Sequence, residues 1–190
     1  MPSALENMSS GVGEDPSSLS STDIDIDIVD DAWLNVADVV SVSERAIMAA
    51  LSAFDLKDVP LELGCRLTSD ADSHALNKEY RSKDKPTNVL SFVGVAPEML
   101  ETETAAARAG GPPLMLGDLV LAYGTVAHEA GEQGKSVTDH LSHLLVHGVL
   151  HLLSHDHIEV DAAEIMEALE RNILEKMGID DPYKDDETRL

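Results

Sequence analysis

Six of the eight histidines in this sequence lie in one stretch, His140–His157 (HLSHLLVHGVLHLLSHDH). The first four are spaced three, four and four residues apart, so on an α-helix they fall within about 80° of one another. Leucine and valine fill most positions between them, so we expect a buried helix. A buried imidazole without a partner costs about 1–3 kcal/mol. Each histidine could be a hydrogen-bonded core residue, or a divalent metal ion could satisfy several of them together.

His147 and His151 are four residues apart, which places them on one helical face where both can bind the same ion. His157 follows six residues later, so the helix must end and the chain must turn back before it can join them. This spacing matches the metzincin pattern, in which a glycine makes that turn; here the position is Ser154. Three neutral nitrogens with one open position are typical of a catalytic zinc site. We therefore predict that His147, His151 and His157 bind one metal ion.

The residue after His147 is Gly148, where the zinc peptidases have the glutamate that acts as general base. The metal-binding pattern is thus present without the peptidase base. We predict a hydrolase that is not a peptidase, or one whose base comes from elsewhere. His140 and His143 are expected to be structural residues or to support the metal ligands, and His155, beside the turn, is expected to be exposed.

The charge of the chain limits its partners. Its 36 acidic and 13 basic residues give a net charge of −23, which argues against general nucleic-acid affinity, because Lys and Arg drive phosphate binding. The charge is uneven, since residues 1–44 hold no basic residue. Four basic residues fall within eight positions: Lys78, Arg81, Lys83 and Lys85. We predict that this cationic strip binds a polyanion in a salt-sensitive manner, with Lys83 and Lys85 as substrate-binding residues.

Features of the sequence predict a cytoplasmic protein. No apolar run reaches the roughly 20 residues of a membrane span, and the N-terminus lacks the basic region and apolar core of a signal peptide. The single cysteine, Cys65, excludes an internal disulfide and suits a reducing compartment. We expect Cys65 to act as a small buried hydrophobe within a strand.

Apolar periodicity predicts one α+β domain over residues 23–178, between a disordered tail (1–22) and a polar tail (179–190). Strands are expected at about 23–29, 61–67, 89–93 and 116–122. Helices are expected at about 40–54, 69–81, 126–133 and 161–177, together with the histidine helix, which Ser136 or Thr138 caps.

The predicted fold is a mixed sheet of about four strands covered by helices, with the histidine helix at its centre as a zincin-like site. The aspartates that alternate with isoleucines in 23–29 are expected to protect an exposed sheet edge. Residues 94–113, rich in Ala, Glu, Gly and Pro, are predicted to form a long mobile loop, an insertion in preference to a lid.

Three separated stretches resemble one known family, the YbeY endoribonucleases, which are rRNA maturation factors. Residues 147–157 (HGVLHLLSHDH) are similar to its HGxLHLxGxDH signature, residues 77–92 (NKEYRSKDKPTNVLSF) to its NxxYRxxDxPTNVLSF segment, and residues 116–118 to its LGD strand. The resemblance covers about residues 23–183. The sequence departs from the pattern at Ser154 (usually glycine), His155 (usually aromatic) and Val93 (often proline), and none of these departures removes a ligand.

The resemblance implies zinc-dependent cleavage of single-stranded RNA in 16S rRNA 3′-end maturation and ribosome quality control. It implies the bacterial cytoplasm as the setting and the small ribosomal subunit as partner, one Zn²⁺ held by His147, His151 and His157, and a functional arginine at Arg81. Zinc lowers the pKa of its bound water to about 7. A guanidinium suits the charge that builds on the phosphate oxygens during cleavage. The alternative for Arg81 is a solvated cation at a helix end.

Two other functions stay open on the residues alone. A ribosome-assembly factor with a structural metal would bind RNA without cutting it, and both the missing glutamate and the negative charge favour it. A metallopeptidase is disfavoured by Gly148. Thr87, Asn88 and Ser91 either position the substrate or form the turn before a strand. Asp118 either supports the metal site or belongs to an ordinary Gly-Asp bulge.

Overall fold

The structure is a computed structural model that describes residues 22–155 and 160–184. Except for Thr22, the N-terminal tail expected to be disordered lies outside these residues. The described part contains one four-stranded sheet in the order β1-β2-β4-β3, in which the first three strands are parallel and β3 is antiparallel to β4. The strands are β1 (Thr22–Ile28), β2 (Leu61–Thr68), β3 (Val89–Val93) and β4 (Leu114–Ala122). The predicted mixed four-stranded sheet is therefore confirmed.

The strand β1 lies at one edge of this sheet. Its three isoleucines are partly buried against the core, whereas Asp23, Asp25 and Asp27 are exposed on the opposite face. Asp27 accepts a hydrogen bond from Arg66 Nε of β2 at 3.2 Å. The strand that carries the alternating aspartates is thus an edge strand, as predicted.

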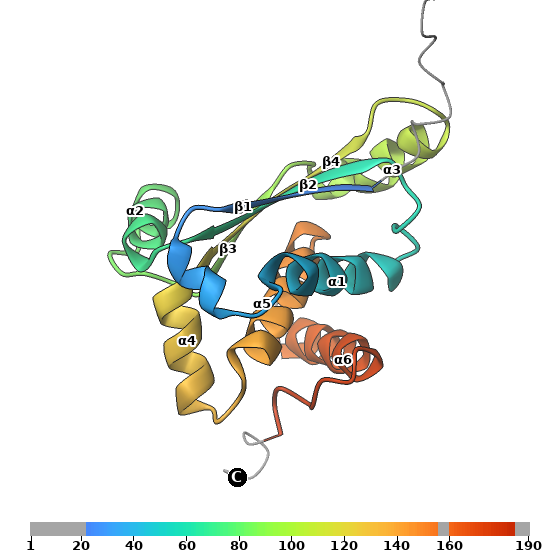
Figure 1. Cartoon of the computed structure of the whole chain (residues 1–190). Coiled ribbons are helices and arrows are strands. Elements are labelled where there is room, and N and C mark those ends of the chain that lie inside the picture. The colour runs from blue at the N-terminus through green and yellow to red at the C-terminus, as the bar shows by residue number, and fades with distance from the viewer. Residues whose placement is uncertain (1–21, 156–159, 185–190) are drawn as a thin grey trace, which may run out of the picture.

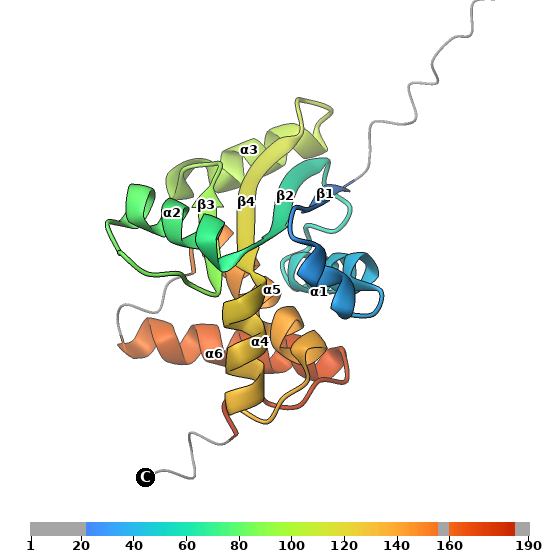
Figure 2. The same ribbon diagram turned by 60° about the vertical axis from the view of Figure 1, so that its left-hand side comes forward.

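Helices cover mainly one face of the sheet. In Figures 1 and 2, α1, α4, α5 and α6 lie on the same side, with α6 beyond α5, whereas α2 lies beside β3 and β4. The bounds are α1 (Val39–Ser52), α2 (Asp70–Arg81), α3 (Leu100–Arg108), α4 (Tyr123–Glu132), α5 (Val137–Leu152) and α6 (Val160–Lys176), with short 3₁₀ turns at η2 (Asp31–Asn35) and η3 (Pro97–Met99).

The histidine helix α5 is the centre of the molecule, because it packs on β3, β4, α1, α4 and α6. Its N-cap is Ser136, whose Oγ accepts a hydrogen bond from Asp139 N at 3.0 Å. Gly148 lets its backbone approach the sheet: a Cβ there would lie 2.7 Å from Leu119 Cδ2 and 3.4 Å from Ser91 Oγ. The close approach fixes the rotation of α5 on the sheet, and with it the directions in which His140 meets α4 and His143 and His147 meet α6.

The helix α2 begins at the predicted N-cap, Ser69, whose Oγ accepts a hydrogen bond from Asp72 N at 3.2 Å. It ends at Ser82, which is left-handed with φ 55°. The following loop is held by buried Asn77, which accepts from Lys83 N at 3.2 Å and donates to Lys85 O at 2.8 Å. The end of α2 and the start of the cationic strip are therefore fixed in place.

Two segments are more ordered than the sequence indicates. The prediction of an irregular loop at 94–113 is wrong, because α3 occupies its middle; Ala107 is buried there, and Arg108 donates to Asp55 O at 2.7 Å. Beyond the predicted domain end at 178, Ile179 packs against the core and Pro182 O accepts from Lys135 Nζ at 2.6 Å. The C-terminal segment up to residue 184 is thus part of the packed structure.

No helix within residues 22–155 and 160–184 is long and apolar enough to cross a membrane. Cys65 is 2% exposed, and burial raises the pKa of its thiol to about 12. A thiol that stays protonated at neutral pH is a poor nucleophile, so Cys65 is the buried hydrophobe predicted.

Candidate metal centre

Two histidines predicted to bind metal face each other on α5. The Nε2 atoms of His147 and His151 are 3.0 Å apart, and the two rings stand at 81° with centroids 4.5 Å apart. Two imidazole nitrogens bound to one tetrahedral zinc at 2.0–2.1 Å would lie about 3.3 Å apart. The pair therefore already has nearly the separation that a shared ion requires.

The protonation of His147 also fits a metal. Its Nδ1 lies 2.8 Å from Glu170 Oε1, which belongs to α6. An ionised carboxylate can only accept, so Nδ1 is the donor, and in the neutral imidazole the lone pair is then on Nε2, which faces His151. This is the arrangement in which a carboxylate orients a metal-binding histidine. The residues present thus fit a zinc ion.

Glu170 is a buried residue of this site that the sequence did not single out. It is 1% exposed and receives hydrogen bonds from His147, from His143 Nε2 at 2.9 Å and from the Tyr183 hydroxyl. Burial alone would raise the pKa of Glu170, but the hydrogen bonds from the two histidines outweigh it and lower the pKa to about 2. The available signal is its position: it falls four residues after Met166 and three before Ile173, on the buried stripe of an amphipathic helix.

The third predicted ligand, His157, lies outside the described residues, and within those residues no group of three His, Cys, Asp or Glu side chains is arranged for a metal ion. The chain does leave α5 as predicted, because Ser154 is left-handed with φ 67° and His155 N donates to Leu150 O at 2.9 Å. The prediction that His155 is exposed is wrong. Its ring lies 5.1 Å from that of Phe54, and burial lowers the pKa of His155.

His140 and His143 have the hydrogen-bonding roles expected of them. The Nε2 atom of His140, which is 3% exposed, lies 2.8 Å from Glu129 Oε2 of α4. Asn88 Nδ2 donates to both oxygens of this carboxylate, at 3.0 and 3.3 Å. Burial would raise the pKa of Glu129, but hydrogen bonds from His140 and Asn88 lower it. Asn88 therefore joins the start of β3 to α4 and α5 rather than merely forming a turn.

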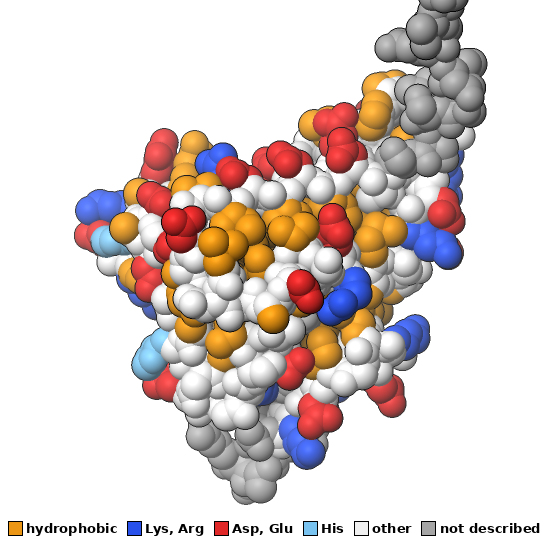
Figure 3. Space-filling view, in the orientation of Figure 1, with side chains coloured by type: hydrophobic (Ala, Val, Ile, Leu, Met, Phe, Trp, Pro, Cys, Tyr) orange, Lys and Arg blue, Asp and Glu red, His pale blue; other side chains and the backbone are white. Residues whose placement is uncertain are grey.

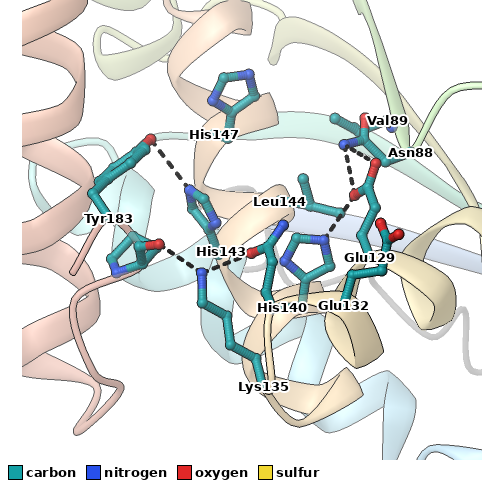
Figure 4. Close-up of a pocket in the computed structure, with 12 residues that line it drawn as sticks. Asn88, Val89, Glu129, Glu132, Lys135, His140, His143, Leu144, His147 and Tyr183 are labelled. Carbon is teal, nitrogen blue, oxygen red and sulfur yellow. Dashed lines mark hydrogen bonds and ion pairs between the residues drawn. The ribbon is translucent and has the colours of Figure 1, made fainter. Parts of the chain in front are cut away.

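A cavity of about 800 Å³ lies between the two carboxylate–histidine networks, and Figure 4 shows its lining. His140, Glu129 and Asn88 stand on one side, with His143 and Tyr183 on the other. His147 lies at one end and Lys135 at the opposite end. The cavity thus gives a molecule in solution access to the region beside His147.

Comparison with known proteins agrees with these motifs. Residues 26–178 match the family model described as Endoribonuclease YbeY. The chain belongs to the YbeY family. Proteins named Endoribonuclease YbeY are 47% identical in Paramagnetospirillum magneticum (85% of this chain, 95% of that protein) and 49% identical in Rhodopseudomonas palustris strain BisB5 (83% and 80%). A solution structure of TM1509 from Thermotoga maritima matches with a TM-score of 0.47 at 18% identity, over 81% of this chain and 91% of that one.

The fold connects the two longest YbeY-like stretches. Arg81, at the end of α2, donates from Nη2 to Ser91 O of β3 at 3.3 Å. Ser91 Oγ in turn donates to Gly148 O of α5 at 3.3 Å. Ser91 therefore links Arg81 by hydrogen bonds to the backbone of Gly148, the residue after His147. Lys83 and Lys85 are exposed on the loop beyond it.

The third YbeY-like stretch lies elsewhere. Asp118 is exposed on the sheet face opposite α5 and sits over Gly64, so it does not support the histidines. Its strand does contain the bulge considered from the sequence: Met115 pairs with Glu62 but Gly117, at φ 131°, pairs with Leu63.

Proposed function

We propose that this member of the YbeY family is a zinc-dependent endoribonuclease that cleaves single-stranded RNA. The main support is the pair His147 and His151, whose Nε2 atoms converge to 3.0 Å while Glu170 holds the His147 tautomer that can bind metal. The relatives that bear the name Endoribonuclease YbeY agree with this assignment.

In this proposal, separate residues of the chain bind the metal ion and the RNA. His147 and His151, with His157, would hold the ion, which when bound supplies a Lewis acid and a bound water of lowered pKa. Arg81 would bind the nonbridging oxygens of the phosphodiester, where charge develops during cleavage. Lys83 and Lys85 would bind neighbouring phosphates of the same strand. Gly148 occupies the position of the peptidase base, and it has no side chain because its backbone packs against Leu119.

We further propose that the substrate is the 3′ end of 16S rRNA, that the enzyme also acts in ribosome quality control, and that it meets the small ribosomal subunit in the bacterial cytoplasm. Family membership supports this setting. The net charge of −23 supports recognition of RNA at a local cationic strip rather than over a broad surface.

A chelation-controlled assay tests the proposal. The purified protein should contain about one zinc per chain, cut a labelled single-stranded RNA, lose this activity on exhaustive chelation and regain it with stoichiometric zinc. His147→Ala should lose both metal and activity. Arg81→Ala should keep its metal and fold but cut about 10²–10³-fold more slowly. Arg45→Ala, which changes an exposed arginine of α1, is the matched control. Cleavage that survives complete chelation would end the proposal.

A non-cleaving ribosome-assembly factor with a structural metal is the second candidate. The packing of Gly148 favours it, because no general base can stand beside the ion at that position. It predicts that His147→Ala lowers the melting temperature and that nuclease-free preparations of the wild-type protein bind RNA but yield no product.

A further inference from the structure

A buried carboxylate in α6 joins three parts of the chain that are distant in sequence. Glu170 is 1% exposed and accepts hydrogen bonds from His143 Nε2 and His147 Nδ1 of α5, and from the hydroxyl of Tyr183 in the C-terminal segment. Burying an ionised carboxylate is costly unless its oxygens are saturated with donors. Here three donors reach the two oxygens, at least one on each, so the charge is retained in the interior.

The retained charge has a chemical consequence for His147. A carboxylate accepts hydrogen bonds and never donates them, so it permits only the His147 tautomer with a proton on Nδ1. In that tautomer the lone pair is on Nε2, which lies 3.0 Å from His151 Nε2. With the opposite tautomer, a proton would occupy the position at which an ion must bind.

The third donor is delivered by the C-terminal segment. Pro182 O accepts from Lys135 Nζ at 2.6 Å. Arg171 lies 3.4 Å from Asp181 and stacks over the ring of Tyr183 at 5.0 Å. Burial and the charge of Glu170 raise the pKa of Tyr183, so the phenol stays protonated and remains a donor. These contacts fix the phenol on the carboxylate.

We propose that Glu170 is a positioning residue that holds His147 ready to bind metal, and that Tyr183 completes its hydrogen bonding. The inference rests on the proposed metal site and deepens it. Glu170 acts through the histidine and does not touch the ion or the RNA. The C-terminal segment is accordingly part of the functional site, although the sequence places it beyond the domain.

Three variants of the full chain test this role. Glu170→Gln keeps the shape of the side chain but replaces one accepting oxygen with an NH₂ donor. This NH₂ group can bond to His147 only if His147 adopts the opposite tautomer. Tyr183→Phe removes one donor and keeps the ring. Glu175→Gln, at an exposed position of the same helix, is the matched control. Zinc affinity is measured by competition with a chromophoric chelator, and the tautomer of His147 by ¹H–¹⁵N spectra of the imidazoles in the metal-free protein.

We expect Glu170→Gln to weaken zinc binding about 10–100-fold and to shift the proton of His147 from Nδ1 towards Nε2. Tyr183→Phe should weaken binding less, and Glu175→Gln should change neither property. If Glu170→Gln does not fold, judged by circular dichroism, Tyr183→Phe decides the question, and unchanged zinc affinity there overturns the inference.

Failure of the inference differs from failure of the proposed function. If the wild-type protein binds zinc and Glu170→Gln binds it equally well with the same His147 tautomer, Glu170 has no positioning role and the endoribonuclease proposal stands. If the wild-type protein binds no zinc, the proposed function fails. A metal-free wild-type spectrum with the His147 proton on Nε2 would overturn the inference in either case.

Discussion

At Gly148 the backbone of α5 lies close against the sheet. A Cβ there would lie 2.7 Å from Leu119 Cδ2, and Leu119 is fully buried. The sequence presents Gly148 as a missing catalytic base. The structure presents it as a packing requirement of the helix that carries the histidines, so a glutamate there would have to displace the buried Leu119 side chain or move that helix.

Gly148→Glu should therefore destabilise the protein by more than about 3 kcal/mol, because it overpacks the core and buries a carboxylate without a partner. Urea denaturation measures the loss. Gly131→Glu is the control, since Gly131 is an exposed position of α4 where a Cβ meets nothing within 4 Å. Equal stability of the two variants would contradict the close packing of α5 on the sheet.

The positions of the histidines could be predicted from the sequence, but their carboxylate partners could not. His147 and His151 are related by helical spacing, which is a local property. Glu170 reaches His147 only because α6 packs on α5. Asn88 and Glu129 are likewise 41 positions apart. Contacts of this kind depend on the folded arrangement, and a single sequence carries no periodic signal for them.

Among the helices, the end of α5 sets the direction in which the chain leaves the helix. Ser154 has φ 67°, a left-handed conformation that disfavours any residue with a Cβ. Its amide donates to His151 O at 3.0 Å, which closes the last turn of the helix. The turn that ends α5 therefore begins with a locally strained serine.

Ser154→Gly should stabilise the protein by about 0.5–1 kcal/mol, because glycine adopts this conformation without steric cost. Ser52→Gly is the control: Ser52 is right-handed helical at the end of α1, so the same change should cost about 0.5 kcal/mol there. Thermal or urea unfolding of both variants checks the opposite signs. A clearly destabilised Ser154→Gly would mean that the serine side chain itself supports the turn.

Elements with periodic apolar residues were predictable, and those defined by packing were not. The four strands and the helix caps Ser69 and Ser136 follow local patterns and are confirmed. The sequence does not indicate α3, because Gly and Pro residues surround its short run of Ala and Glu. The polar composition of 179–184 predicts a tail, whereas Tyr183 is held by Glu170 and Arg171.

Over the molecule as a whole, acidic residues outnumber basic ones by 36 to 13. Figure 3 shows Asp and Glu side chains spread over the face seen in Figure 1, with Lys and Arg side chains scattered among them. Against this background the strip at the end of α2 is unusual. Lys83 and Lys85 are exposed, and buried Asn77 fixes the backbone of both. Two cations on a fixed stretch of backbone, on an otherwise acidic body, would hold RNA at one place and repel it elsewhere.

The double variant Lys83→Ala/Lys85→Ala should consequently weaken binding of single-stranded RNA while leaving zinc content and folding unchanged. Each phosphate contact contributes about 0.7 to the slope of log affinity against log salt for a single strand, so the loss of two should flatten the slope by about 1.4. Fluorescence anisotropy over a series of salt concentrations measures both quantities. The control Lys57→Ala/Lys176→Ala removes the same charge from two other exposed lysines, so a general change in net charge would affect both pairs alike. A change of slope for the first pair, with none for the second, would show that the RNA backbone binds at the cationic strip. Equal slopes for the two double variants would exclude binding there.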